Sequence, residues 1–345
     1  MKIRHTLPAD EPWLIASVER LFGLRARGAG LALGIGDDCA AIVPSRGTEL
    51  LISTDTLVEN IHFRRAWAAP KLIGAKAVTV TVSDIAAMGG TARFLLVSLV
   101  FPHGETSQWL GALLRGIQGA ARRHGVRVIG GNVAASDGPL SITLTATGEI
   151  RKGARIDRSG ARPGDAIYLT GTPGDAGLGL WLLEQGQREP RGLVRRHHSP
   201  EPRLAWGALL AYRHIASAMI DLSDGVALDL LRMMKASGVR GRVELARIPF
   251  SRAARAVINH HGQPAMTRAL TGGEDYELAF TVPPGKRAEL TRLIASGKIK
   301  ASRVGAVIYP LQTLCLMIGL AQVFGEAGAP AGGVSTRRSN VLQKS

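Results

Sequence analysis

The chain has 345 residues, of which 46% are hydrophobic and 20% are charged, values that are typical of a folded globular protein and exclude a disordered one. Its 43 Lys and Arg residues exceed its 27 Asp and Glu residues, so the formal net charge is +16. A chain of this length predicts about two domains, each large enough to bury a core.

The positive charge makes the chain a candidate nucleic-acid binder. The basic residues are scattered, however, and no segment interleaves them with the aromatic residues that stack bases, which form 5% of the chain. We therefore interpret the charge as a solvated basic surface or as an attraction for anionic substrates. No specific nucleic-acid partner is predicted.

Cysteine usage indicates the compartment. The two cysteines, Cys39 and Cys315, form no CxxC pair, which is typical of a reducing environment. The first residues, MKIRHTLPADEPW, contain no apolar signal core. We expect a cytoplasmic protein.

In chain order, residues 1–150 predict a mixed α/β domain. Two helical patterns run from about 72 to 88 and from 108 to 124, with apolar residues along one face of the second. Strands are expected where short segments are rich in β-branched or large apolar residues, at 51–55, 94–101, 126–130 and 140–150.

The polar, glycine-rich and basic segment 151–165 predicts a domain boundary, so residues 151–310 would form a second α/β domain. A loop is expected around RRHHSPEP at 195–202. Strands are predicted at 166–171, 243–249, 276–282 and 301–308, and helices at about 175–186, 225–237, 250–261 and 286–297.

The last segment, 311–345, is predicted to be a poorly ordered tail. From Val304 to Gly325 there is no charged residue, a length that would permit a membrane span. Pro310, Gln312 and several glycines argue against a span, and no membrane partner is predicted.

Five acidic clusters are the strongest functional signal, and they are spread over both halves. Each joins an apolar strand or helix to a Gly, Ser or Thr turn, a pattern that suits carboxylates projecting from rigid elements into one cleft. Hard cations such as Mg²⁺ use these oxygens and bridge them to substrate phosphates. The clusters are GIGDDCAAI (34–42), STDTLVENIHF (53–63), VSDIAAMGG (82–90), DLSDG (221–225) and GGEDYEL (272–278).

Any single cluster has an ordinary structural explanation. Asp224 precedes a helix and is a favoured N-cap residue. Ser53 and Thr54 suit a strand end, and Asp275 or Glu277 would be surface residues of a strand. Five clusters together are harder to explain in this way, because carboxylates that share a cleft repel one another and need a compensating cation.

Other chemistries lack their motifs. There is no G-x-x-x-x-G-K-[ST] phosphate loop and no G-x-S-x-G nucleophile elbow. The histidine pairs at 197–198 and 260–261 are adjacent in sequence and do not share one helical face, so surface histidines are the preferred interpretation.

Six segments together resemble the thiamine-monophosphate kinase family. They are GIGDDCAAI, STDTLVENIHF, KAVTVTVSDIAAMGG, RSGARPGDAIYLTGTPGDAGLGL, IDLSDGVALDL and LTGGEDYELAFTV, and the match runs in order from about Leu33 to Val307. This family belongs to an ATP-binding superfamily with aminoimidazole ribonucleotide synthetase, selenophosphate synthetase and a hydrogenase maturation protein. DLSDG is shared across the superfamily, whereas STDTLVENIHF with GGEDYELAF is specific to the kinase.

The resemblance implies a two-domain aminoimidazole ribonucleotide synthetase-like α/β fold. Residues 1–150 would bind ATP and several Mg²⁺ ions, and would pair their mixed sheet across a homodimer. The reaction would be phosphorylation of thiamine monophosphate to thiamine diphosphate with ATP as co-substrate. The acceptor is already a phosphate, so we expect direct metal-assisted transfer with no catalytic side chain and no covalent intermediate.

The resemblance also assigns residues to sites. The positions matching the family's metal ligands are Asp37, Ser53, Thr54, Asp55, Asp84, Asn132, Asp221 and Asp224. The positions matching its ATP contacts are Gly131, Asn132, Arg158 and Ser223, and those matching its thiamine-phosphate contacts are His62 and Glu274.

Two departures from the family pattern stand out. The usual GGD is Gly130-Gly131-Asn132 here, so an amide replaces a carboxylate; its oxygen still ligates Mg²⁺, without the charge. After about Ile308 the resemblance stops, and the GYDHF-like segment, whose nearby aromatic packs on thiamine in the family, is absent.

Two alternatives stay open from the sequence. One is another small-molecule ATP-dependent enzyme of the superfamily, although no cysteine near the N-terminus matches the catalytic residue of selenophosphate synthetase. The other is an inactive nucleotide-binding regulatory or nucleic-acid-associated protein, which Asn132 and the positive charge favour.

Overall fold

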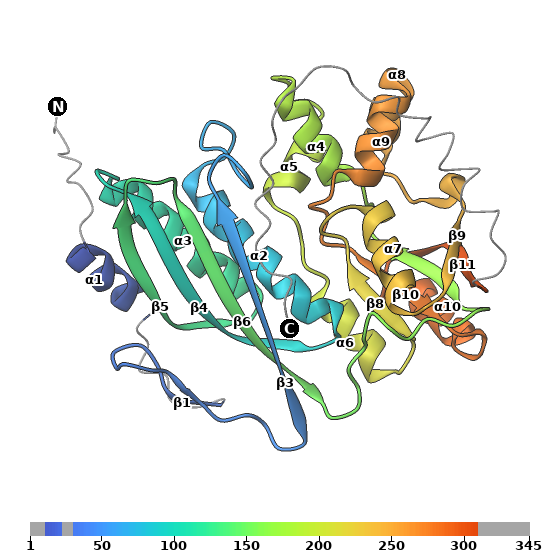
Figure 1. Ribbon diagram of the computed structural model, residues 1–345, viewed down its shortest axis with the longest axis horizontal. Coiled ribbons are helices and arrows are strands. Elements are labelled where there is room, and N and C mark those ends of the chain that lie inside the picture. Colours follow the sequence, from blue (N-terminus) through green and yellow to red (C-terminus); the bar gives the residue numbers. More distant parts are fainter. Residues whose placement is uncertain (1–10, 23–29, 310–345) are drawn as a thin grey trace.

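The computed structural model describes residues 11–22 and 30–309 (Figure 1). The predicted tail, 311–345, lies outside the described residues. Within the described part of the chain, no helix has the length and apolar character needed to cross a membrane. Figure 1 shows two sheets in two halves of the molecule, and residues 152–165 between the sheets form no helix or strand.

The first half contains a four-stranded sheet in the order β3-β6-β4-β5. Its β4 and β5 strands are parallel and the other pairs are antiparallel, so the sheet is mixed. Helices α2 and α3 pack on one face (Figure 1). The bounds are β3 Thr48–Val58, α2 Pro70–Ala87, β4 Thr91–Pro102, α3 Ser107–Arg123, β5 Arg127–Ser136 and β6 Ser141–Arg151.

Three further elements flank this sheet. Helix α1 (Glu11–Phe22) packs against α3 and β5. Strands β1 (Leu31–Leu33) and β2 (Ala41–Ile42) form a small hairpin, and Leu31 packs on Phe94 and Ile129 of the sheet. The loop of this hairpin therefore lies over the end of the sheet that β4 and β5 form.

Helix α2 is the central element of the fold. It is apolar on nearly all sides, as expected of a helix that packs against neighbours all round. It contacts α3 and the sheet of the first half, and also α5, α6 and β8 of the second. The approach is close: a Cβ on Gly116 would lie 2.1 Å from Lys71 O, and one on Gly207 would lie 2.1 Å from Ala86 O.

The second half contains a five-stranded antiparallel sheet in the order β8-β10-β7-β11-β9. Its strands are β7 Ala166–Thr170, β8 Ala218–Asp221, β9 Arg240–Val243, β10 Leu278–Val282 and β11 Ala301–Ile308. Its helices are α4 Asp175–Glu184, α5 Arg191–His198, α6 Leu204–Tyr212, α7 Val226–Ala236, α8 Arg252–His261, α9 Gln263–Thr271 and α10 Arg287–Ala295. Leu245–Arg247 and Pro284–Lys286 form 3₁₀ turns.

The predicted α/β class with a mixed sheet in the first half is confirmed. Two local predictions are wrong. The strand expected at 243–249 ends at Val243, because the edge strand β9 leaves the sheet there and enters the 3₁₀ turn. The loop expected at 195–202 begins as the last turn of α5, whose basic residues suit the negative end of a helix dipole.

Candidate active site

Strand β3 divides its polar residues between two faces. Side chains alternate along a strand, and the inner positions of β3 face α2 while the outer positions are exposed. Ser53 and Asp55 lie on the inner face. Thr54 lies on the outer face, where its hydroxyl is 3.2 Å from that of Thr145. The predicted role of Thr54 as a metal ligand stays a prediction, and its side chain does not join those of its two neighbours.

Asp84 meets this inner face from α2. Its carboxylate accepts a hydrogen bond from the Ser53 hydroxyl. Burial, and then the negative charge of Asp84, raise the pKa of Asp55 to about 6, against a hydrogen bond from Thr81 that lowers it. Two predicted metal ligands thus lie close enough to repel each other.

Asp221 joins these carboxylates from the second half. It ends β8, and its carboxylate accepts a 2.7 Å hydrogen bond from the Ser83 hydroxyl of α2. Burial, and then the charge of Asp84, raise the pKa of Asp221 to about 7, while the charge of Arg158 acts in the opposite direction. The charge of Asp84 therefore acts on both Asp55 and Asp221. We call these three residues the junction carboxylates.

The junction carboxylates fit a hard cation in part. Their mutual repulsion is the condition that a divalent ion relieves, and oxygen is the ligand atom that Mg²⁺ prefers. Within residues 11–22 and 30–309, however, no three His, Cys, Asp or Glu side chains converge closely enough to hold an ion. Ions bound here would need additional oxygen ligands, and Mg²⁺ commonly takes these from water and substrate phosphates.

The DLSDG loop is held by an aspartate that the sequence interpretation left out of the site. The buried Asp229 accepts backbone hydrogen bonds from Asp224 (2.9 Å) and Gly225 (3.1 Å), and so it caps the start of α7. Asp224 itself is half-exposed and pairs with Arg232, which also bonds Asp229 at 2.9 Å. Asp224 is thus oriented by an arginine, outside the junction carboxylates.

The GGEDYEL loop packs directly against the DLSDG loop. The backbone N–H of Glu274 donates to Ser223 O (2.9 Å), and that of Tyr276 donates to Leu222 O (3.0 Å). Gly273, Glu274 and Tyr276 all have φ between +52° and +66°, a region that costs a side-chain-bearing residue about 1 kcal/mol or more. The loop is therefore strained where it carries a predicted substrate contact.

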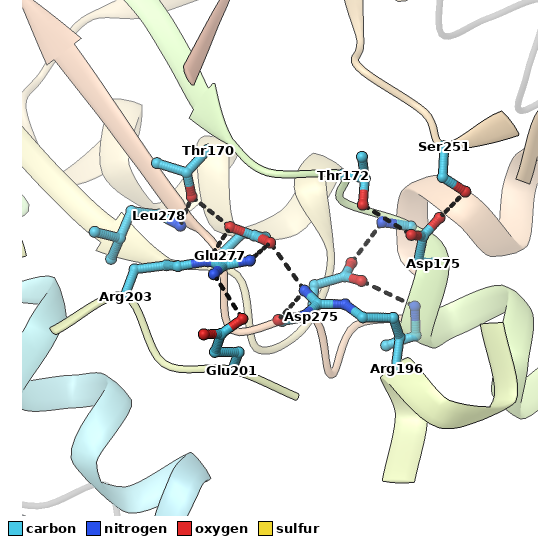
Figure 2. Close-up of polar contacts among 12 residues, drawn as sticks. Thr170, Thr172, Asp175, Arg196, Glu201, Arg203, Ser251, Asp275, Glu277 and Leu278 are labelled. Carbon is cyan, nitrogen blue, oxygen red and sulfur yellow. Dashed lines mark hydrogen bonds and ion pairs between the residues drawn. The ribbon is translucent and has the colours of Figure 1, made fainter. Parts of the chain in front are cut away.

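Two buried carboxylates hold this strained loop in place (Figure 2). Asp275 accepts hydrogen bonds from the backbone N–H groups of Gly174 (2.6 Å) and Ala176 (3.0 Å) at the start of α4. Burial raises the pKa of Asp275 to about 7, although these two hydrogen bonds lower it. The ordinary explanation of Asp275 as a surface residue of a strand therefore does not hold, because its side chain is buried.

Glu277 is the centre of the same network, with a side chain that is 0% exposed. It accepts hydrogen bonds from Thr170 (2.6 Å), from Arg196 (2.8 Å) and from Arg203 (2.7 Å) (Figure 2). The same ordinary explanation, a surface residue of a strand, does not hold for Glu277 either. The positive charges of Arg196 and Arg203 balance the negative charge of Glu277. We therefore assign Glu277, with Asp275, to a structural network, here called the scaffold, that holds the loop in position.

His62 lies in the turn after β3 and is exposed. Its Nδ1 accepts a 3.0 Å hydrogen bond from the backbone N–H of Val58. The surrounding segment is anchored by Arg65, which pairs with Glu59 at 2.7 Å, pairs with Glu105, and stacks 4.2 Å from the Trp109 ring centroid. The predicted thiamine-phosphate contact therefore projects from an anchored turn.

A cavity of about 1070 Å³ lies between the β1–β2 hairpin and strands β4, β5 and β6. Asp37, Gly131 and Asn132 line it together. Asp37 is exposed and accepts a 2.8 Å hydrogen bond from the N–H of Asp38. The junction carboxylates do not line this cavity, so the structure divides the predicted metal ligands between two places.

Arg158 and Ser223 are the remaining predicted ATP contacts. Arg158 is exposed, in the connection between the two sheets, and its charge reaches Asp221. Ser223 is half-buried between the two packed loops. Of the junction carboxylates, Asp221 is therefore the one that both residues lie near: Arg158 affects it through its charge, and Ser223 follows it in the DLSDG loop.

Several residues at the site were missed from the sequence. Lys76 pairs with Glu274 across the two halves, and it was detectable as a cation inside the otherwise uncharged stretch between Lys71 and Asp84 of α2. Ser83 was detectable as the neighbour of Asp84. Arg196 and Arg203 had no signal, because they are two of many scattered basic residues.

Comparison with known proteins supports the same assignment. Residues 36–150 match the model of the AIR synthase related protein N-terminal domain, and residues 162–309 match that of its C-terminal domain. The thiamine-monophosphate kinase of Escherichia coli (strain K12) is 38% identical over 302 residues, which cover 85% of this chain and 90% of that protein.

Solved structures give the same result. The crystal structure of thiamine-monophosphate kinase from Stenotrophomonas maltophilia K279a superimposes with a TM-score of 0.77 at 32% identity, covering 88% of this chain and 95% of that one. AaThiL complexed with AMPPCP and TMP has a TM-score of 0.69 at 28% identity, covering 90% and 93%. With its fold, its motifs and its relatives in agreement, the chain belongs to the thiamine-monophosphate kinase family.

Proposed function

We propose that this protein transfers the γ-phosphoryl group of ATP to thiamine monophosphate, giving thiamine diphosphate. The observation that carries the proposal is the meeting of Asp55, Asp84 and Asp221 from three elements of both halves. The relatives are named for this acceptor, and AaThiL was solved with AMPPCP and TMP. Carboxylates that repel one another suit a reaction in which divalent cations accompany phosphates.

The junction carboxylates would hold Mg²⁺, which supplies charge neutralisation for the transferred phosphoryl group when bound. Ser53 and Ser83 orient Asp84 and Asp221 through hydrogen bonds. With pKa values raised to about 6 and about 7, Asp55 is mostly ionised and Asp221 partly protonated near neutral pH, so a bound cation would displace the remaining protons. Direct transfer then needs no general base from this chain.

The other predicted residues complete two binding regions. Gly131 and Asn132 line the cavity with Asp37, which supports their assignment to ATP and its Mg²⁺. Arg158 offsets negative charge beside Asp221, as an ATP-contacting arginine would. His62, in the turn after β3, and Glu274, beside α2 and the DLSDG loop, would bind thiamine phosphate. The assignments of Ser223, Thr54 and Asp224 rest on the family pattern alone.

We further propose a homodimer that pairs the outer faces of the two four-stranded sheets. Apolar side chains stand exposed on this face, with Ile52 at 66%, beside Leu50 and Leu96. The cavity opens on the same side of the sheet, since Thr143 and Thr145 line it. A partner sheet would cover both features. Light scattering should show a dimer that Ile52→Lys dissociates and that Leu231→Lys, a change at an exposed residue of α7, leaves intact.

A coupled assay tests the function. Purified protein with ATP and Mg²⁺ should form ADP and thiamine diphosphate when thiamine monophosphate is added, with one product of each per turnover. Chelation of divalent cations should stop the reaction. Absence of thiamine diphosphate under these conditions would refute the proposal. A cytoplasmic location is proposed from the cysteine usage alone.

A further inference from the structure

Lys76 is a buried cation at the junction of the two halves. Its side chain is 4% exposed, inside the apolar helix α2. A buried ammonium is costly unless a counter-charge accompanies it. That counter-charge is Glu274, which reaches Lys76 from the strained loop of the second half and forms an ion pair with it.

The neighbours of this pair are neutral. His197 Nδ1 lies 3.8 Å from Glu274 Oε2, and His198 lines the same small pocket as Lys76. Burial, and then the charge of Lys76, lower the pKa of His197 to about 2 and that of His198 to about 4. Among the ion pairs of the described residues, Lys76 is therefore the one partner of Glu274 that is charged at neutral pH.

The two oxygens of Glu274 differ in their surroundings. Both contacts of the carboxylate, with Lys76 and with His197, go to Oε2, and this atom is buried. The Glu274 side chain is nevertheless 20% exposed, so its accessible surface belongs to other atoms. Neither of these contacts goes to Oε1, so this oxygen is left to accept a ligand while Lys76 holds Oε2.

Helix geometry relates this pair to the junction carboxylates. Lys76 precedes Asp84 by eight residues, which places them about 80° apart around α2 and about 12 Å apart along its axis. The loop that carries Glu274 also hydrogen-bonds the DLSDG loop through Ser223. The Lys76–Glu274 pair is therefore connected to the junction carboxylates in two ways: through α2, which also carries Asp84, and through the DLSDG loop, which follows Asp221.

We propose that Lys76 is a positioning residue for the substrate: it fixes Glu274 across the two halves so that the free carboxylate oxygen meets the thiazolium cation of the thiamine moiety. The inference rests on the proposed function and concerns the acceptor only. Lys76 acts through Glu274, so its loss should weaken the use of thiamine monophosphate and leave the use of ATP unchanged. A merely structural lysine would lower stability without this selectivity.

Steady-state kinetics of four variants test the proposal, with ATP and thiamine monophosphate varied separately. Lys76→Met should raise KM for thiamine monophosphate about tenfold while KM for ATP changes less than about twofold. Lys76→Arg, which keeps the charge, should recover most of the loss. Glu274→Gln and the double variant should have equal KM values, because the lysine has no effect once its partner is gone. Lys71→Met, at the exposed start of α2, is the matched control and should match the wild type.

The outcomes separate this inference from the function. A wild-type protein that does not phosphorylate thiamine monophosphate refutes the proposed function itself. An active wild type with an unchanged KM for thiamine monophosphate in Lys76→Met overturns the role of Lys76. Equal increases for both substrates, or losses that multiply in the double variant, overturn it as well. If Lys76→Met does not fold, the same cycle with Lys76→Gln and Glu274→Gln decides, since Lys76→Gln also removes the charge and independent losses would again multiply.

Discussion

The molecule contains two buried groups of carboxylates that differ in what surrounds their oxygens. Asp275 and Glu277 accept hydrogen bonds from backbone N–H groups, a hydroxyl and two arginines (Figure 2). Asp84 and Asp221 accept theirs from serine hydroxyls and repel each other. Burial raises the pKa of both Asp221 and Asp275 to about 7, so a raised pKa alone does not separate the groups.

The difference in partners separates a scaffold from a binding site. A carboxylate whose charge is met by arginines has no need of a further cation, and removing one partner leaves the other buried and unpaired. Carboxylates that face one another keep their affinity for a divalent ion. We therefore expect the two groups to respond oppositely to the loss of a charge.

The largest effect is expected at the junction carboxylates. Asp84→Asn should lower kcat at least about 1000-fold, because it removes a charge that would hold Mg²⁺ against the reacting phosphates. The same change should raise the free energy of unfolding of the metal-free protein, since it relieves repulsion with Asp55 and Asp221. Rates at saturating substrate and urea unfolding in EDTA measure the two effects.

Glu244→Gln is a suitable control for this variant, because Glu244 pairs with Arg247 after β9, the edge strand opposite to the β8 strand that carries Asp221. It should leave kcat within about twofold of the wild type. Near-normal activity of Asp84→Asn at limiting Mg²⁺ would contradict the metal assignment.

The scaffold should behave in the opposite way. Glu277→Gln leaves Arg196 and Arg203 beside a neutral amide, so the free energy of unfolding should fall by about 3–5 kcal/mol. Glu201→Gln is the matched control: it also pairs with Arg203, at 3.0 Å, but its side chain is 68% exposed. Its cost should stay below about 1 kcal/mol.

Urea unfolding of these two variants tests the comparison directly. If Glu277→Gln and Glu201→Gln lower the free energy of unfolding by the same amount, burial of an ion pair does not determine how much that pair stabilises the protein. If Glu277→Gln instead loses activity with full stability, Glu277 belongs to the site and the division into scaffold and site is wrong.

The junction carboxylates could be identified from the sequence because each lies in a short motif of neighbouring residues. Asp55 and Asp84 lie in a strand and a helix that were correctly predicted, whereas the strand that ends at Asp221 was not predicted and only its apolar run with the DLSDG motif marked the position. Alternation along β3 also implied that Ser53 and Asp55 would share a face. The same alternation places Thr54 on the opposite face, although the family resemblance grouped all three residues as metal ligands.

The scaffold could not be predicted, because its partners are distant in sequence. Glu277 lies 74 residues from Arg203 and 107 from Thr170. Taken alone, Glu277 had an ordinary explanation as a surface residue of a strand, but it directly precedes β10, an interior strand of its sheet that is buried at every residue. The charge of Arg203 looked like one of many on a basic surface.

An intermediate effect is expected from pH and Mg²⁺ together. Burial and repulsion raise the pKa of Asp55 to about 6 and that of Asp221 to about 7, from an ordinary value of 3.8. The folded state therefore binds more protons than the unfolded state between pH 4 and 7, and the free energy of unfolding in EDTA should fall as pH rises through this window. Added Mg²⁺ should reduce the fall, because a cation replaces the protons.

Asp275 supplies the contrast within the same experiment. Its raised pKa adds to the fall in stability between pH 4 and 7, but its oxygens already have partners, so Mg²⁺ should not reverse that part. Thermal unfolding of wild type and Asp84→Asn at several pH values, with and without Mg²⁺, measures both parts. A Mg²⁺ response that persists in full in Asp84→Asn would place the ions elsewhere.

The smallest effect is expected at Asn132, where an amide replaces the family's carboxylate. Asn132 lines the cavity with Asp37 and not with the junction carboxylates, so an ion shared by these two residues would be held by one formal charge from the pair. Asn132→Asp should lower the Mg²⁺ concentration for half-maximal activity by about three- to tenfold, the range of one charge-assisted contact reduced by repulsion from Asp37 and Asp38.

Asn132→Leu separates ligation from structure at the same position. It keeps a similar size without an oxygen ligand, and it should raise the half-maximal concentrations of both ATP and Mg²⁺. If Asn132 only serves its own backbone after Gly130 and Gly131, both variants should shift thermal stability and leave the Mg²⁺ dependence unchanged. That result would remove Asn132 from the cation-binding set and leave Asp37 as the acidic ligand of this cavity, with the reaction depending on ions held at Asp55, Asp84 and Asp221.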